Sequence, residues 1–120
     1  ILYAMLGTTN GFNLNDKILV IEDLDEYLYH IDRMMMAMKK AGKLQGLKAL
    51  LVGGMSDMKD NAIPFGKTAE EIIIEHCSPY GYPIIFNAPI GHITNNHAIK
   101  LGSEITLRKS LDSNSIEMVV

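Results

Sequence analysis

"KILVIED", residues 17–23, is a continuous apolar run that ends in two carboxylates, and it follows the polar loop "TTNGFNLND". A run of this composition predicts a buried strand. Over residues 25–41 the apolar side chains recur with the period of a helix, and Gly42 supplies a C-terminal stop. The apolar positions of this helix are Leu28, Ile31, Met35 and Met38. A strand that leads directly into a helix indicates an α/β domain.

The middle of the chain repeats this order of elements. "LKALLVGG" (47–54) predicts a second buried strand, and its two closing glycines predict a turn at the strand end. Residues 55–66 predict a loop. Thr68-Ala-Glu-Glu71 has the pattern of a capping box, which opens a helix that continues through about Cys77. "PIIF" (83–86) predicts a third strand.

The end of the chain predicts a β-hairpin. "SEITLRK" (103–109) and "SIEMVV" (115–120) have strand composition, and they flank the turn sequence "SLDSN". The order of strand, helix, strand, helix, strand and hairpin predicts a single mixed α/β domain over residues 1–120. Neither a repeat nor a linker interrupts this order.

The composition excludes several classes of protein. Hydrophobic residues make up 48% of the chain and charged residues 21%, which is typical of a folded domain. The net charge is −3 and the longest basic runs are two residues long, so nucleic acid is a poor partner. No apolar run reaches the roughly 18 residues that a membrane span requires.

The cysteine count and the N-terminus bear on the compartment. The single cysteine, Cys77, cannot form an intrachain disulfide, and this favours a reducing compartment, which we expect to be the cytoplasm. The N-terminus has no basic region and is therefore not expected to be a signal peptide. It begins in the middle of a pattern, as though cut from a longer chain.

His92 is the first candidate for a functional residue. It follows the third predicted strand after a short turn, and Gly91 precedes it. Ligand sites of α/β sheets lie beyond the carboxyl ends of the strands, on loops that a rigid frame holds. A glycine there allows a tight bend or a close approach of the backbone. The alternative is a surface-loop histidine beside an incidental glycine.

Glu22 and Asp23 are the second candidates, because they end the first predicted strand. A carboxylate directly after four apolar residues needs a partner if it is buried, and an imidazole is a suitable one. A carboxylate and a histidine at the same edge of a sheet would form two-thirds of a general-base system. The alternative is that these acids only lie near the N-terminus of the next helix, where negative charge is mildly favourable.

A nucleophile for such a system is missing from the sequence. None of the serines lies in a G-x-S-x-G setting on a strand-to-helix turn. Ser56, after "VGGM", is the least unsuitable, but no helix follows it closely. The residues alone therefore predict a base and its orienting acid with nothing to activate.

A metal site is the rival interpretation. The possible ligands are His30, His76, Cys77, His92 and His97. The chain contains neither a C-x-x-C pair nor H-E-x-x-H, so the zinc signal is weak and we expect neither metal nor cofactor. The methionines of "RMMMAM" have helical spacing, which is more typical of core filling or an adaptable interface than of metal ligands.

Four segments carry a resemblance to a known family. They are "KILVIEDLDEYLYHIDRMM", "ALLVGG", "PIIFNAPIGH" and "LGSEITL", in that order along the chain. They resemble the C-terminal domain of the LD-carboxypeptidases, a serine peptidase family, and the resemblance covers nearly all 120 residues. One departure is His30, at a position where many relatives have arginine.

The resemblance implies a fold and an activity. The implied fold is a swivelling β/β/α domain with a mixed sheet, and the implied reaction removes the terminal D-amino acid from murein tetrapeptide. The family uses a Ser-Glu-His triad without metal, and its glutamate and histidine fall on Glu22 and His92. From their positions beside these two residues, we expect Asp23 and Gly91 to play a supporting part. The nucleophilic serine and the oxyanion hole belong to an N-terminal domain, so residues 1–120 alone are expected to be inactive.

Two other functions remain open at this stage. Some members of the family hydrolyse a peptide-nucleotide antibiotic and confer self-immunity. A different class altogether is a non-catalytic binding or assembly module, and the methionine-rich helix could serve a homodimer interface. The presence of both Glu22 and His92 speaks weakly against a non-catalytic module.

Overall fold

The computed structural model describes residues 1–8, 12–109 and 116–119. A short 3-10 helix, η1 (Tyr3–Met5), precedes the domain, and a second, η2 (Ser78–Tyr80), follows α2. The α-helices are α1 (Leu28–Lys40) and α2 (Ala69–Cys77). The strands are β1 (Ile18–Leu24), β2 (Ala49–Ser56), β3 (Ile84–Ile85), β4 (Thr106–Lys109) and β5 (Ile116–Val119).

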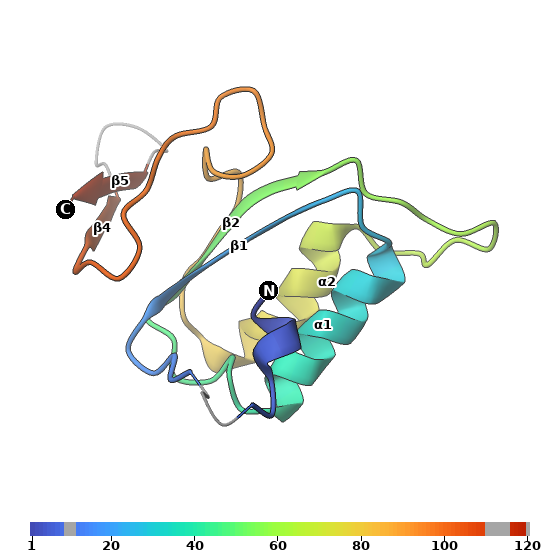
Figure 1. Ribbon diagram of the computed structural model, residues 1–120, viewed down its shortest axis with the longest axis horizontal. Coiled ribbons are helices and arrows are strands. Elements are labelled where there is room, and N and C mark those ends of the chain that lie inside the picture. The colour runs from blue at the N-terminus through green and yellow to red at the C-terminus, as the bar shows by residue number, and fades with distance from the viewer. Residues whose placement is uncertain (9–11, 110–115, 120) are drawn as a thin grey trace.

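The strands form two sheets. The first is parallel, in the order β1-β2-β3, and the second is the antiparallel pair β4-β5. Both helices lie on one side of β1 and β2, whereas the segment after β3 and the β4-β5 pair lie on the other side (Figure 1). The predicted α/β class with two helices and a C-terminal hairpin is therefore confirmed, with parallel and antiparallel strands in separate sheets. The predicted turn of the hairpin, residues 110–114, lies outside the described residues.

The core has two parts, one on each face of β2. On the helix side, buried residues of both helices pack against the sheet, and Leu50 and Val52 are almost completely buried there. On the other side, Leu51 packs with Ala88 and Ile90 from the segment after β3. A central parallel strand is apolar on both faces because both are covered, which explains the continuous apolar run in its sequence.

The methionines of α1 mainly fill the core. Met35 and Met38 are buried, and Met34 packs partly against the same cluster. Met36 is exposed. Among the described residues, neither helix combines the length and the apolar character that a bilayer crossing demands.

The C-terminal end of α1 follows from its local sequence, whereas its N-terminal end depends on a contact with β2. The C-terminal stop at Gly42 is confirmed: its φ is +70°, and Lys43 N–H donates to the Met38 carbonyl at 2.9 Å, as in a Schellman motif. The start is three residues later than predicted, because Asp25 has a φ of +62° and donates its N–H to the Ser56 carbonyl. A residue in this left-handed conformation cannot continue a helix.

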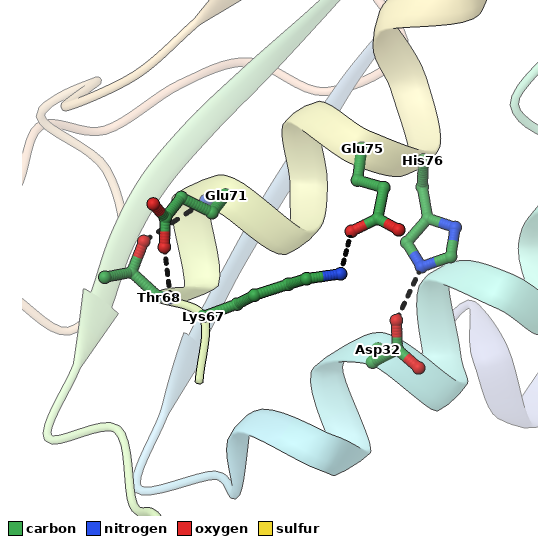
Figure 2. A network of polar contacts seen from close by, with 6 residues as sticks. All are labelled: Asp32, Lys67, Thr68, Glu71, Glu75 and His76. Carbon is green, nitrogen blue, oxygen red and sulfur yellow. Dashed lines mark hydrogen bonds and ion pairs between the residues drawn. The ribbon is translucent and has the colours of Figure 1, made fainter. Parts of the chain in front are cut away.

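The capping box of α2 is present as predicted. Thr68 Oγ1 accepts from the Glu71 N–H at 3.2 Å, and the Glu71 carboxylate accepts from the Thr68 N–H at 2.8 Å (Figure 2). Further along this helix, His76 is buried, and its Nε2 lies 2.8 Å from Asp32 Oδ1 of α1 (Figure 2). This pair ties the two helices together beneath the sheet.

The prediction of a turn at Gly53 and Gly54 was wrong. Both glycines lie inside β2, which continues to Ser56. The register of β1 against β2 changes here: Ile21 is opposite Val52, but Asp23 is opposite Met55. One residue of β1, Glu22, therefore stands against two residues of β2, and the glycines form a β-bulge rather than a strand end.

Candidate active site

Glu22 and His92 lie in contact although 70 positions separate them in the chain. His92 Nδ1 is 2.8 Å from Glu22 Oε2. The Glu22 side chain is 31% exposed and the His92 side chain 61%, so the pair lies at the surface and can be reached from outside. Since an ionised carboxylate can only accept hydrogen bonds, Nδ1 carries the proton of this contact. Nε2 is then the basic nitrogen, and it has no hydrogen-bond partner among the described residues.

Side chains of β1 alternate between the two faces of the sheet, and Glu22 projects to the face opposite the helices. Ile18 and Val20 pack with the second core cluster, on the side of the sheet opposite the helices. Glu22 is the next residue of the same parity, so it projects to the same side. Gly53 of β2 leaves room for the Glu22 side chain because it has no Cβ. A Cβ there would lie 3.3 Å from Glu22 Cβ and 2.4 Å from the Ile90 carbonyl oxygen.

Gly91 is required where the loop meets Glu22. Its φ is +101°, a conformation that side chains with a Cβ rarely adopt. A Cβ at this position would lie 2.6 Å from Glu22 Oε2 and 2.8 Å from Glu22 Cβ. The glycine before His92 is therefore a condition for the contact between the carboxylate and the imidazole.

Two polar side chains hold the backbone around His92. Ser56 Oγ donates to the His92 carbonyl at 2.9 Å, and Asn96 Oδ1 accepts from the Gly91 N–H at 3.0 Å. Sequence reasoning considered Ser56 only as a nucleophile and did not identify Asn96. The hydroxyl of Ser56 is engaged with a backbone carbonyl, so this contact does not prepare it for attack on a substrate.

Asp23 does not join the pair. By strand alternation it lies on the face opposite Glu22. Its Oδ1 accepts from the N–H of Leu24 at 2.9 Å, and partial burial raises the pKa of this carboxyl, with the negative charges of Glu26 and Glu22 acting in the same direction. A direct supporting contact between Asp23 and His92 is absent among the described residues.

The acids that follow serve the start of α1. Glu26 Oε1 accepts from the Tyr27 N–H at 2.7 Å, and this bond lowers the pKa of Glu26. The same oxygen lies 2.8 Å from His30 Nδ1. Asp25 pairs with Lys59. The alternative interpretation, that the acids only favour the helix N-terminus, therefore describes Glu26 but not Glu22.

The rival metal site is not assembled in the described part of the chain. Within it, no three histidine, cysteine or carboxylate side chains come together in a way that could hold an ion. His76 and Cys77 are buried beneath the sheet, and His30 contacts Glu26. His97 Nε2 lies 3.0 Å from Asn95 Oδ1.

A small cavity adjoins the loop of His92. Its volume is about 280 Å³, and it lies along the C-terminal half of β2, from Val52 to Ser56. The side chains that line it include Ser56, Glu70, Asn87 and Ile93, and the backbone of Gly53 and Gly54 forms one wall. Glu22 and His92 do not line this cavity; Gly53, which adjoins Glu22, and Ile93, which follows His92, do.

The fold and this pair define an α/β domain with a carboxylate-supported histidine at the carboxyl edge of a parallel sheet. Residues 1–107 match the family model described as the LD-carboxypeptidase C-terminal domain. The chain belongs to this family.

Two relatives are similar over almost the whole chain. It is 28% identical, over 98% of its length, to the "Probable murein peptide carboxypeptidase" of Bacillus subtilis (strain 168). The crystal structure of muramoyltetrapeptide carboxypeptidase from Oxalobacter formigenes superposes on 98% of the chain with a TM-score of 0.82 and 25% sequence identity. The chain spans only 37% of the first protein and 40% of the second.

Proposed function

We propose that this chain supplies the glutamate and the histidine of a Ser-Glu-His triad in a serine LD-carboxypeptidase. The contact of 2.8 Å between Glu22 Oε2 and His92 Nδ1 carries the proposal. The membership of the family and the murein peptide carboxypeptidase among the relatives support the substrate, a murein tetrapeptide that loses its terminal D-amino acid.

In this proposal His92 is the general base. Its Nε2 takes the proton of a serine hydroxyl that comes from a part of the protein outside these 120 residues, while that oxygen attacks the amide carbonyl. Glu22 holds the ring through Nδ1 and stabilises the imidazolium that forms. His92 then passes the proton to the departing amine of the D-amino acid, and water releases the acyl group in a second, equivalent round.

The proposal makes residues 1–120 inactive alone. Among the described residues, no serine or threonine hydroxyl hydrogen-bonds to the His92 ring, and Ser56 is engaged with a carbonyl. The proposed setting is the cytoplasm, on peptides recovered from the cell wall. The single buried Cys77, which forms no intrachain disulfide, is compatible with that setting.

The test uses the intact protein that contains this chain and measures the release of D-alanine from murein tetrapeptide. Glu22→Gln keeps an oxygen that can accept the Nδ1–H but removes the charge, and it should lower kcat by about 10³- to 10⁴-fold. His92→Asn should lower kcat at least as much. Asp23→Asn is the matched control, because its side chain lies on the other face, and it should retain nearly normal turnover.

Three outcomes would replace the proposal. Hydrolysis of an aminoacyl-nucleotide analogue in preference to the tetrapeptide would place the protein with the peptide-nucleotide hydrolases of the family. Unchanged kcat in both Glu22→Gln and His92→Asn would remove the two residues from catalysis altogether. If the wild type releases no product from either substrate, the alternative of a non-catalytic binding or assembly module replaces the enzyme.

A further inference from the structure

The side chain of His92 is not held in place by packing. It is 61% exposed, and the residue before it is a glycine, the residue with the greatest backbone freedom. A general base must nevertheless keep its ring within a few tenths of an ångström of the productive position, because a misplacement of about 1 Å can cost 10²-fold in rate. Something other than a hydrophobic neighbourhood must fix the backbone that carries this ring.

Ser56 has the geometry for this task. Its Oγ donates to the carbonyl of His92 itself at 2.9 Å. Its own backbone is fixed to β1, since Ser56 is paired with Leu24 and its carbonyl accepts from the Asp25 N–H at 2.9 Å. Leu24 lies two residues after Glu22 on the same strand. Ser56 therefore connects the strand that carries the acid directly to the residue that carries the base.

Asn96 acts from the other side of the loop. Its Oδ1 accepts from the N–H of Gly91 at 3.0 Å, one residue before His92. Main-chain bonds complete the loop: Gly54 N–H donates to the Ile90 carbonyl at 2.9 Å, and His97 N–H donates to the Pro89 carbonyl at 2.7 Å. One side chain thus holds the N–H of the residue before His92, and another holds the carbonyl of His92 itself.

We infer that Ser56 and Asn96 are positioning residues that hold the imidazole of His92 against Glu22. This inference rests on the proposed function, because it assigns the two side chains a task in the same site. Neither touches the reacting atoms. Ser56 holds the carbonyl of His92 close to the end of β2, which is paired with β1. Asn96 holds the turn at Gly91 in its conformation.

The kinetic test uses the intact protein with murein tetrapeptide. Ser56→Ala and Asn96→Ala should each lower kcat by about tenfold with little change in KM, since an acid–base group out of place loses transition-state stabilisation rather than binding. Asn96→Asp keeps an acceptor oxygen for the Gly91 N–H and should restore most of the rate. Ser103→Ala removes a hydroxyl far along the chain from the loop and should retain wild-type kinetics.

A double-mutant cycle separates positioning from general stability. If Ser56 acts through the Glu22–His92 contact, Ser56→Ala should cost less than about threefold in a Glu22→Gln background, because the contact it supports is already weakened. An equal loss in both backgrounds would show that the effect is merely structural and would overturn the inference.

A measurement without substrate keeps the inference separate from the proposed function. With ¹⁵N-labelled histidine, the Nδ1–H of His92 in contact with a carboxylate should give a protected proton resonance in the intact protein. Ser56→Ala and Asn96→Ala should broaden or remove it, and Ser103→Ala should leave it unchanged. Persistence of the resonance in both loop variants would overturn the inference. Its selective loss would support the inference even if Glu22→Gln and His92→Asn left turnover unchanged and the proposed function failed.

Discussion

Gly91 and Glu22 are packed so closely that no side chain fits between them. A Cβ on Gly91 would approach the carboxylate oxygen, the Cβ and the Cγ of Glu22 to 2.6, 2.8 and 2.9 Å. All three distances are below those that real Cβ atoms show, and the atoms concerned include the base of the side chain, which cannot swing away. The contact between Glu22 and His92 therefore depends on a residue that contributes no atom to it.

Gly91→Ala should break the contact between Glu22 and His92. The methyl group forces Glu22 or the loop to move, and kcat of the intact protein should fall by at least about 100-fold. Gly102→Ala is the matched control, because Gly102 also has a positive φ, +75°, but nothing lies within 4 Å of its Cβ position. Both variants lose about 1–2 kcal/mol of stability from the left-handed backbone. Equal turnover in the two variants would contradict the role of the close contact.

Asp32→Ala should destabilise the helix layer. His76 is buried, and its Nδ1 has no partner among the described residues, so Asp32 provides the one hydrogen bond seen for this ring. Removing the carboxylate leaves a second buried nitrogen unsatisfied, which should cost about 1–3 kcal/mol in the free energy of unfolding. Urea denaturation of the intact protein measures this loss. The control is Glu70→Ala at an exposed position of α2, where we expect only a small change; a similar loss there would refute the explanation.

Thr68→Ala should weaken the start of α2. It removes the oxygen that accepts from the Glu71 N–H and opens the capping box, at a cost of about 1 kcal/mol. Thr68→Ser keeps the hydroxyl and should be nearly neutral. Amide hydrogen exchange over residues 69–73 is the local measurement, and unchanged protection in Thr68→Ala would show that tertiary packing alone holds this turn.

Asp23→Asn should stabilise the protein at neutral pH. Burial raises the pKa of Asp23 above its ordinary value of 3.8, so the folded state binds this proton more tightly than the unfolded state. The favourable contribution is present below pH 3.8 and is lost as the pH rises through the folded-state pKa. The variant should therefore melt at a higher temperature than the wild type at pH 7 and at the same temperature near pH 3.

Glu26→Gln should change the stability at neutral pH in the opposite direction. The Tyr27 N–H lowers the pKa of Glu26 below its ordinary value of 4.5, so its stabilising contribution is present above pH 4.5 and is lost as the pH falls through the folded-state pKa. This variant should be less stable than the wild type at pH 7, and the difference should shrink in acid. If both variants shift the melting temperature in the same direction, the burial of Asp23 is not the cause.

Sequence patterns predicted the elements where local chemistry decides. The apolar run of β1, the capping box at Thr68 and the stop at Gly42 each specify their structure within a few residues. The start of α1 was predicted too early because the left-handed conformation of Asp25 is stabilised by a carbonyl on β2. That contact joins segments 31 positions apart, and no local pattern reports it.

Local sequence patterns also predicted part of the candidate site. The positions of Glu22 and His92 after apolar strands, together with the family resemblance, predicted a pair whose contact the structure shows, and their catalytic roles stay a prediction. Gly53 and Gly54 were predicted to form a turn, because two glycines after an apolar run usually end a strand, and this prediction was wrong. Here the strand continues because Met55 and Ser56 still pair with β1, and Gly53 is a glycine because a Cβ there would lie 2.4 Å from the Ile90 carbonyl oxygen. Ser56 and Asn96 carry no local signal, since they act on a backbone that only the fold brings near.

The bulge of β2 has a consequence for how sequences of this kind can vary in length. One residue of β1 faces two of β2 at this point, and one of these two glycines, Gly53, adjoins both Glu22 and the Ile90 carbonyl. Adding or deleting a residue between Val52 and Met55 would shift Glu22 against the loop of His92 and would change the pairing of Met55 and Ser56 with β1. Related chains should therefore accept insertions in the loop over residues 57–66 and tolerate none within the glycine pair.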